Sequence, residues 1–161
     1  MAQIGRHGVL VLCGVLLSVA AAGGVSTQRA DTKSVEDAVL AVSAEMTKAG
    51  EAADADRLFG YMLETDKGSV IQNGVLMATR QEALERVRTN LGGISRIQYR
   101  WKRQYVTVLS PEVAVLAAEG ESTATTTAGE TFTAPFAQTV VFVLRGGTWK
   151  AIHAHQSSPR R

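Results

Sequence analysis

Two histidines near the end of the chain, His153 and His155, lie two residues apart in the stretch GTWKAIHAHQS over residues 147–157. On a β-strand this spacing directs both imidazoles to the face that also carries Trp149 and Ala151, with the two histidine backbones about 7 Å apart. Such a pair can share a metal ion, can exchange protons with a bound molecule because imidazole titrates near neutral pH, or can form part of a pocket wall. The pair alone does not decide among these three roles.

A metal site needs more than the two imidazoles. Zinc or iron would take at least one further protein ligand, and the remaining candidates are Glu119, Glu121, Asp66 and His7. The sequence places none of them beside the histidines. We therefore expect neither a metal nor an organic cofactor.

Acid–base catalysis and a purely structural role both require no metal. In the catalytic role, His153 acts with Glu119 or Asp66. Tyr61 or Tyr105 would then donate a hydrogen bond to charge that develops on the substrate. In the structural role, the histidines are hydrogen-bonded wall residues, which is the more common function of a histidine on a half-buried strand.

Aromatic and amide side chains mark the walls of a pocket. Gln138 lies on the same strand face as Phe136, Val140 and Phe142, and a buried amide needs hydrogen-bond partners. Aromatic residues at alternating positions can equally fill a core. The residues that we expect to line a ligand site are Tyr61, Trp101, Tyr105, Phe136, Gln138, His153 and His155.

Helical spacing of apolar residues predicts the elements that precede these strands. A capping box at Ser34 opens a first helix, and Asp54 caps a second, shorter one. Two short strands, residues 69–72 and 76–78, meet at an Asn-Gly turn. Thr79 then caps a third helix, which ends at a pair of glycines.

From Ile94 onward, the apolar period changes to that of β-strands. Four long strands follow, and a bulge between Lys102 and Gln104 would exchange the two faces of the first one. Helices followed by strands predict an α+β domain, in which three N-terminal helices pack on a curved antiparallel sheet around a cavity.

The composition fits one globular domain, with 45% hydrophobic and 20% charged residues among 161. The net charge is only +2, and acids are interspersed with bases. A nucleic-acid partner is therefore not expected.

The first residues resemble a secretory signal peptide. Arg6 precedes a run of small and apolar residues, and three alanines offer a cleavage site after about Ala22. An uncleaved membrane anchor is the alternative. We expect a secreted or periplasmic protein with no stable membrane association after cleavage. The expected divisions are a signal peptide over residues 1–25, a polar linker over 26–33, a domain over 34–157 and a tail over 158–161.

Three stretches resemble the SnoaL-like branch of the nuclear transport factor 2-like superfamily. They are the acidic link over residues 49–58, the capped helix from Thr79, and the closing strand over residues 147–155, which is similar to the pattern G-x-W-K-I-x-H-x-H-x-S. The chain is similar also to the branch of the calcium/calmodulin-dependent kinase association domain. The resemblance implies a cone-shaped α+β fold with a pocket, and sheet-to-sheet homodimers. It implies no single activity, because enzymes, binding proteins and oligomerisation domains share this fold.

These observations favour a protein that holds a small apolar ligand in its cone and forms a homodimer through its sheet. One alternative is a cofactor-free isomerase, dehydratase or hydrolase that uses a pocket histidine. A second alternative is an oligomerisation module.

Overall fold

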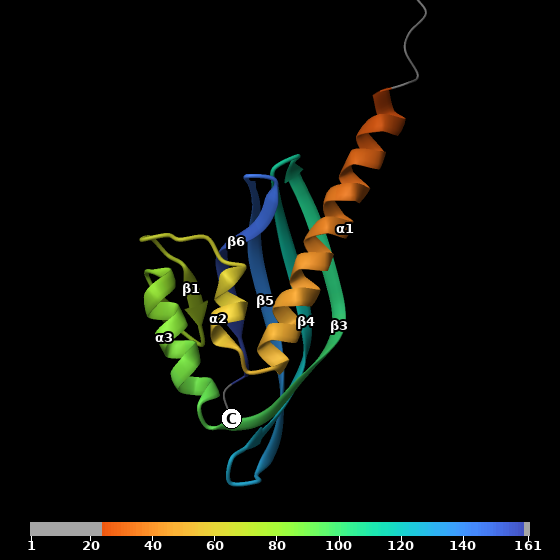
Figure 1. Cartoon of the computed structure of the whole chain (residues 1–161). Coiled ribbons are helices and arrows are strands. Elements are labelled where there is room, and N and C mark those ends of the chain that lie inside the picture. Colours follow the sequence, from red (N-terminus) through yellow and green to blue (C-terminus); the bar gives the residue numbers. More distant parts are fainter. Residues whose placement is uncertain (1–23, 160–161) are drawn as a thin grey trace, which may run out of the picture.

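One curved sheet carries the fold. The structure is a computed structural model that describes residues 24–159, and within them it has three helices and a sheet of six strands (Figure 1). The helices are α1 (Gly24–Glu51), α2 (Ala55–Gly60) and α3 (Arg80–Leu91). The strands are β1 (Val70–Gln72), β2 (Val75–Met77), β3 (Ile94–Ser110), β4 (Val113–Thr126), β5 (Thr131–Arg145) and β6 (Thr148–Ser157). The predicted order of elements is confirmed, with the β1–β2 hairpin separating α3 from the first two helices.

The sheet is mixed and not wholly antiparallel. Its strand order is β2-β1-β6-β5-β4-β3, and the four long strands form an antiparallel meander. β1, however, pairs in parallel with β6, from Val70 opposite Ala154 to Gln72 opposite Gln156. The expectation of a purely antiparallel sheet is wrong at this contact, because the hairpin joins the last strand of the chain and not its neighbour in sequence.

The first helix begins earlier than predicted. α1 starts at Gly24, so the linker expected over residues 26–33 is helical and Ser34 lies inside the helix. Lys33 forms a 2.8 Å ion pair with Asp37, an i,i+4 contact that supports a continuous helix. The predicted signal peptide lies almost entirely outside the described residues. No described helix combines the length and the apolar character needed to cross a membrane.

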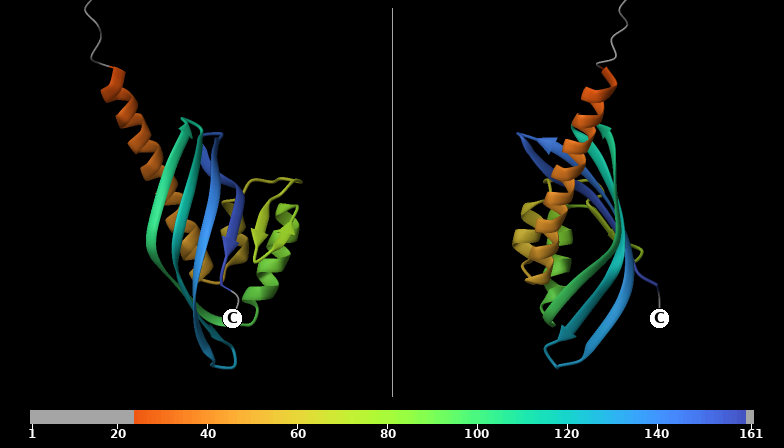
Figure 2. Two further views of the ribbon diagram at one scale, coloured as in Figure 1. Left: turned by 180° about the vertical axis from the view of Figure 1, so that it is seen from behind. Right: turned by 90° about the vertical axis from the view of Figure 1, so that its right-hand side faces the viewer.

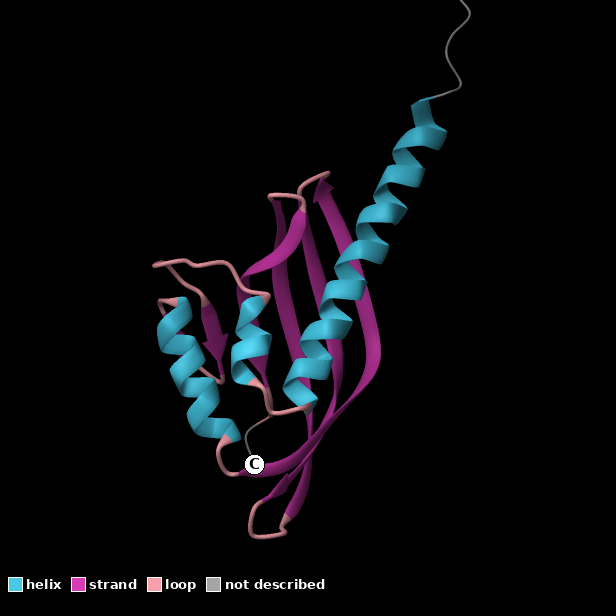
Figure 3. Ribbon diagram, in the orientation of Figure 1, coloured by secondary structure: helices cyan, strands magenta, loops and turns pink. Residues whose placement is uncertain are grey.

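The other two helix starts are as predicted. The Asp54 carboxylate accepts the Arg57 N–H at 2.9 Å, and the Thr79 hydroxyl accepts the Glu82 N–H at 3.0 Å. The Glu82 carboxylate in turn accepts the N–H of Ala78 at 2.9 Å. All three helices lie against the concave face of the sheet, which bends around them (Figures 2 and 3). We call this the inner face, and the opposite one the outer face.

The sheet has four register shifts, and two of them, in β3 and β6, decide which side chains reach the inner face around the cavity. In β3, Trp101 pairs with Gly120 and Arg103 pairs with Glu119, so Lys102 is an extra residue. In β6, Ala151 pairs with Phe142 and His153 pairs with Val141, so Ile152 is an extra residue. Because side chains alternate along a strand, each bulge exchanges the two faces beyond it.

The apolar core lies between the inner face and the helices. Val39, Leu116 and Phe142 are fully buried, and Trp149 and Ala151 belong to the same cluster. Helix α1 contributes Val35, Ala38, Val42 and Met46 at helical spacing. These are the residues whose period predicted the helix.

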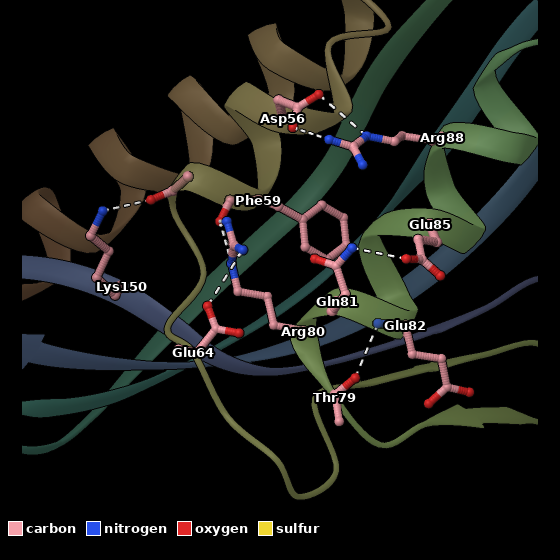
Figure 4. Close-up of polar contacts among 11 residues, drawn as sticks. Asp56, Phe59, Glu64, Thr79, Arg80, Gln81, Glu82, Glu85, Arg88 and Lys150 are labelled. Atoms are coloured by element: carbon pink, nitrogen blue, oxygen red, sulfur yellow. Dashed lines mark hydrogen bonds and ion pairs between the residues drawn. The ribbon is translucent and has the colours of Figure 1, made fainter.

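Arg80, the first residue of α3, holds the end of α2 in place (Figure 4). Its guanidinium donates two hydrogen bonds to the carbonyl of Phe59, at 3.0 and 2.7 Å, and lies 6.0 Å from the centre of the Phe59 ring. An ion pair with Glu64, at 3.6 Å, adds to this contact. The side chain is only 20% exposed, so solvent screens these contacts weakly.

The first prediction concerns Arg80. We expect Arg80→Met to lower the free energy of unfolding by about 1.5–3 kcal/mol, because the charge-assisted bonds to Phe59 are lost. Urea denaturation measures the change. Arg86→Met, on the exposed side of the same helix, is the matched control and should change stability by less than about 0.5 kcal/mol. Equal effects of the two substitutions would contradict the role of Arg80.

The second prediction concerns the β3 bulge. A Cβ atom at Gly120 would lie 2.7 Å from the carbonyl oxygen of Arg100, closer than two such atoms can approach. Gly120→Ala should therefore destabilise the protein by about 1–3 kcal/mol. Gly60→Ala is the control, since a Cβ there meets nothing within 4 Å. A neutral Gly120→Ala would mean that the bulge relaxes freely.

Candidate functional site

A cavity of about 150 Å³ lies between the helices and the inner face. Its helical side includes Ser43, Met46 and Thr47 of α1 and Phe59 of α2. Its sheet side comes from β1, β3, β5 and β6. The cavity therefore joins segments from both ends of the described chain.

Three aromatic rings form one wall of this cavity. The Tyr99 and Trp101 rings of β3 stack with their centres 6.5 Å apart. Phe136 of β5 meets both edge-on, at 5.8 Å from Tyr99 and 5.2 Å from Trp101. These geometries are favourable for aromatic pairs, so the wall is preorganised to receive a flat apolar group.

Three glutamines form a row across the sheet on another side of the cavity. Gln156 of β6 lies opposite Gln72 of β1 on one side and opposite Gln138 of β5 on the other. The Gln72 amide donates a hydrogen bond to that of Gln156 at 2.9 Å. We call these three side chains the amide row.

Tyr99 links the cavity to the end of α1. Its backbone N–H donates a hydrogen bond to the Glu51 carboxylate at 2.9 Å, and its ring packs against Gly50. Burial, and next the nearby charge of Glu51, raise the pKa of the Tyr99 hydroxyl. The phenol therefore stays neutral at physiological pH.

The cavity brings together three of the residues predicted to bind a ligand, namely Trp101, Phe136 and Gln138. Their role in binding stays a prediction. Gln72 and Gln156 were not among the residues predicted to bind a ligand. Gln72 shares a face with Val70, but a strand of three residues is too short for an alternation pattern. The bulge at Ile152 places Gln156 on the face opposite to the one that simple alternation predicts.

The prediction that His153 and His155 share the face of Trp149 and Ala151 is wrong. The bulge at Ile152 turns both histidines to the outer face. His153 is half-buried there, and its Nδ1 donates a hydrogen bond to the carbonyl of Gly68 at 2.6 Å. This contact is structural in character, since it joins β6 to the loop before β1.

Tyr105 and His155 lie together on the outer face, at a shallow groove of about 520 Å³. Tyr105 is there because the β3 bulge at Lys102 exchanges faces. Glu119 lines the same groove, where its carboxylate accepts a 2.8 Å hydrogen bond from Arg103. The sheet thus separates these three residues from the inner cavity.

Asp66 and Tyr61 occupy neither cavity nor groove. Asp66 is exposed in the loop before β1. Tyr61 follows α2, and its ring lies 5.8 Å from the Lys150 ammonium. The structure therefore does not assemble His153, Glu119 and Asp66 into one constellation.

The described part of the chain holds no cluster of three or more histidine, cysteine or acidic residues suited to a metal ion. The side chains found at the inner cavity within residues 31–159 are apolar, aromatic, hydroxyl or amide groups, with no carboxylate, imidazole or cation among them. Such a lining suits the binding of a neutral molecule better than proton transfer.

Comparisons with known proteins agree with this architecture. A family model described as a SnoaL-like domain matches residues 39–161. A comparison with curated protein sequences gives no match.

Solved structures with the same fold come from several bacteria. A candidate dehydratase of the nuclear transport factor 2-like family from Streptomyces avermitilis is 17% identical, with a TM-score of 0.71 over 81% of this chain and 99% of that one. A superfamily member from Salmonella enterica is 15% identical, with a TM-score of 0.69 over 83% and 94%. A candidate calcium/calmodulin-dependent protein kinase II association domain from Xanthomonas campestris is 18% identical, with a TM-score of 0.67 over 76% and 86%.

At these identities the solved structures establish the fold and not an activity. The family model, however, covers most of the chain, including the amide row, the aromatic wall and the closing strand. The chain is therefore a member of the SnoaL-like domain family, with the nuclear transport factor 2-like fold.

Proposed function

We propose that this protein binds a small, mostly apolar molecule in its inner cavity, as an exported ligand-binding module. The observation that carries the proposal is the lining itself, in which a preformed aromatic wall faces a few polar groups without any charged side chain among the described lining residues. Binding there buries apolar surface, which supplies the main driving force.

A catalytic function has less support. Isomerisation, dehydration or hydrolysis by His153 with Glu119 or Asp66 would need these groups around one substrate, whereas the histidine is bonded to Gly68 and the Glu119 carboxylate to Arg103. Binding therefore accounts for the described geometry with fewer assumptions.

The outer groove supports a second proposal, that two copies associate through their sheets. Ala117 and Ala137 form a floor of small residues in the groove, beside Tyr105, a residue that is 61% exposed. In a two-fold contact, the tyrosine of each copy can cover the alanine floor of the other. Arg103 and Glu119 have opposite charges on this face, so they can also pair across such a contact.

The third prediction tests the cavity with toluene as the probe. Toluene should shift the indole NMR signal of Trp101 in a saturable way and change that of Trp149 little, because only Trp101 lines the cavity. Ala154→Leu should weaken this binding at least about tenfold, by filling the cavity. Ala137→Leu, on the outer face, adds the same volume and should leave toluene binding unchanged. The proposal fails if the Trp101 signal of the parent protein responds neither to toluene nor to a six-membered ring of similar size that carries a polar substituent.

The fourth prediction tests association. The parent protein should sediment as a dimer at micromolar concentration, and Tyr105→Glu should sediment as a monomer because it places a charge on the alanine floor. Leu76→Glu is the control, since Leu76 is 57% exposed on β2, away from the groove, and its dimer should persist. A monomeric parent protein at that concentration would rule out the sheet contact.

A further inference from the structure

The amide row defines the polar chemistry of the inner cavity. Gln72, Gln156 and Gln138 lie on three neighbouring strands in direct register, and all three side chains are half-buried. A primary amide carries two donor hydrogens and one acceptor oxygen. Amides that are shielded from water in this way need partners, or they cost free energy.

The Gln72–Gln156 bond leaves a donor and an acceptor unused. The pair shares one N–H and one carbonyl at 2.9 Å. If both amides were flipped, the donor would become Gln156 and the acceptor Gln72. In either orientation, the NH₂ group of one glutamine and the carbonyl oxygen of the other take no part in this bond and are available to a ligand.

Gln138 extends the row toward the aromatic wall. Its amide forms no hydrogen bond with any other described residue and lines the cavity. Phe136 lies two residues away on the same strand face, so the amide and the ring are about 7 Å apart at the backbone. A ligand that stacks on the wall therefore brings its edge to the row.

The charge and the size of the cavity further restrict which ligands can bind there. An ionised group would lose its hydration without a counter-charge among the described lining residues, which costs several kcal/mol in such a site. A volume of about 150 Å³ suits a single six-membered ring. The cavity thus favours one uncharged ring over larger or ionised molecules.

We infer that the ligand of this cavity is an uncharged, single-ring molecule whose edge carries a donor beside an acceptor, as in a carboxamide or a lactam. The inference rests on the proposed binding function and adds the ligand class. The ring occupies the aromatic wall, and the polar edge bonds to the amide row.

Four probes of nearly equal shape test the inference at neutral pH: benzamide, benzoate, benzamidinium and toluene. Binding is followed by the Trp101 indole signal, with Trp149 as the internal reference. We expect benzamide to bind at least tenfold more tightly than each of the other three. Stronger or equal binding of benzoate or benzamidinium would overturn the neutral class. Stronger or equal binding of toluene would overturn the role of the amide row while leaving the proposed binding function intact.

Two substitutions at Gln138 test whether the amide row causes the preference for benzamide. Gln138→Leu should reduce the preference for benzamide over toluene at least fivefold. Gln138→Glu keeps the shape but adds a negative charge, so benzamidinium should gain at least tenfold in affinity while benzamide weakens. Gln98→Glu, on the exposed outer side of β3, is the matched control and should change neither affinity. Unchanged selectivity in both Gln138 variants would overturn the inference. If none of the four probes shifts the Trp101 signal, the proposed function itself fails.

Discussion

The composition of the cavity depends on one residue, Ile152, that has no partner in the sheet. Without it, the alternation that begins at Trp149 would continue and place the two histidines among the helices. With it, Ala154 and Gln156 take those positions and the imidazoles face the other way. At the cavity, the methyl group of Ala154 and the amide of Gln156 thereby stand in place of two imidazoles.

The bulge in β3 has the same effect on the opposite side of the sheet. Before Lys102, the aromatic rings face inward, and beyond it Arg103 and Tyr105 face outward. Charges on the outer face are balanced locally, as the Lys102 ammonium and the Arg100 guanidinium lower the pKa of the Glu121 carboxyl. The two bulges together keep ionised groups on one side of the sheet and neutral groups on the other.

Local signals predicted much of the fold. Short-range chemistry that is visible in the sequence determines several elements. These are the two helix N-termini capped by Asp54 and Thr79, the Asn-Gly turn and the meander of strands. The helix start at Ser34 was wrong, because the capping box is an equally good pattern inside a longer helix.

The site was less accessible to prediction than the fold. Trp101 was identified because it lies before the bulge at Lys102, and Phe136 and Gln138 because β5 contains no extra residue. Tyr105 and His155 each follow a bulge. A bulge near Lys102 was raised from the sequence, but the apolar alternation did not decide whether it occurs, and the bulge at Ile152 was not predicted. The register between strands that are distant in sequence is a long-range property. The pairing of Gln72 with Gln156 therefore could not be predicted without the parallel contact of β1 and β6.

That parallel contact places a short, weakly paired segment in the wall of the cavity. β1 is joined to β6 by only three residue pairs, yet it contributes Val70 and Gln72 to the lining. A short hairpin at the edge of a sheet, such as β1–β2, exchanges its amide hydrogens through local opening at low free-energy cost. A ligand that contacts both β1 and β5 would stabilise this hairpin and slow its hydrogen exchange. The exchange rate of the central strands would stay the same. Hydrogen exchange of the β1–β2 hairpin would therefore report whether the cavity is occupied.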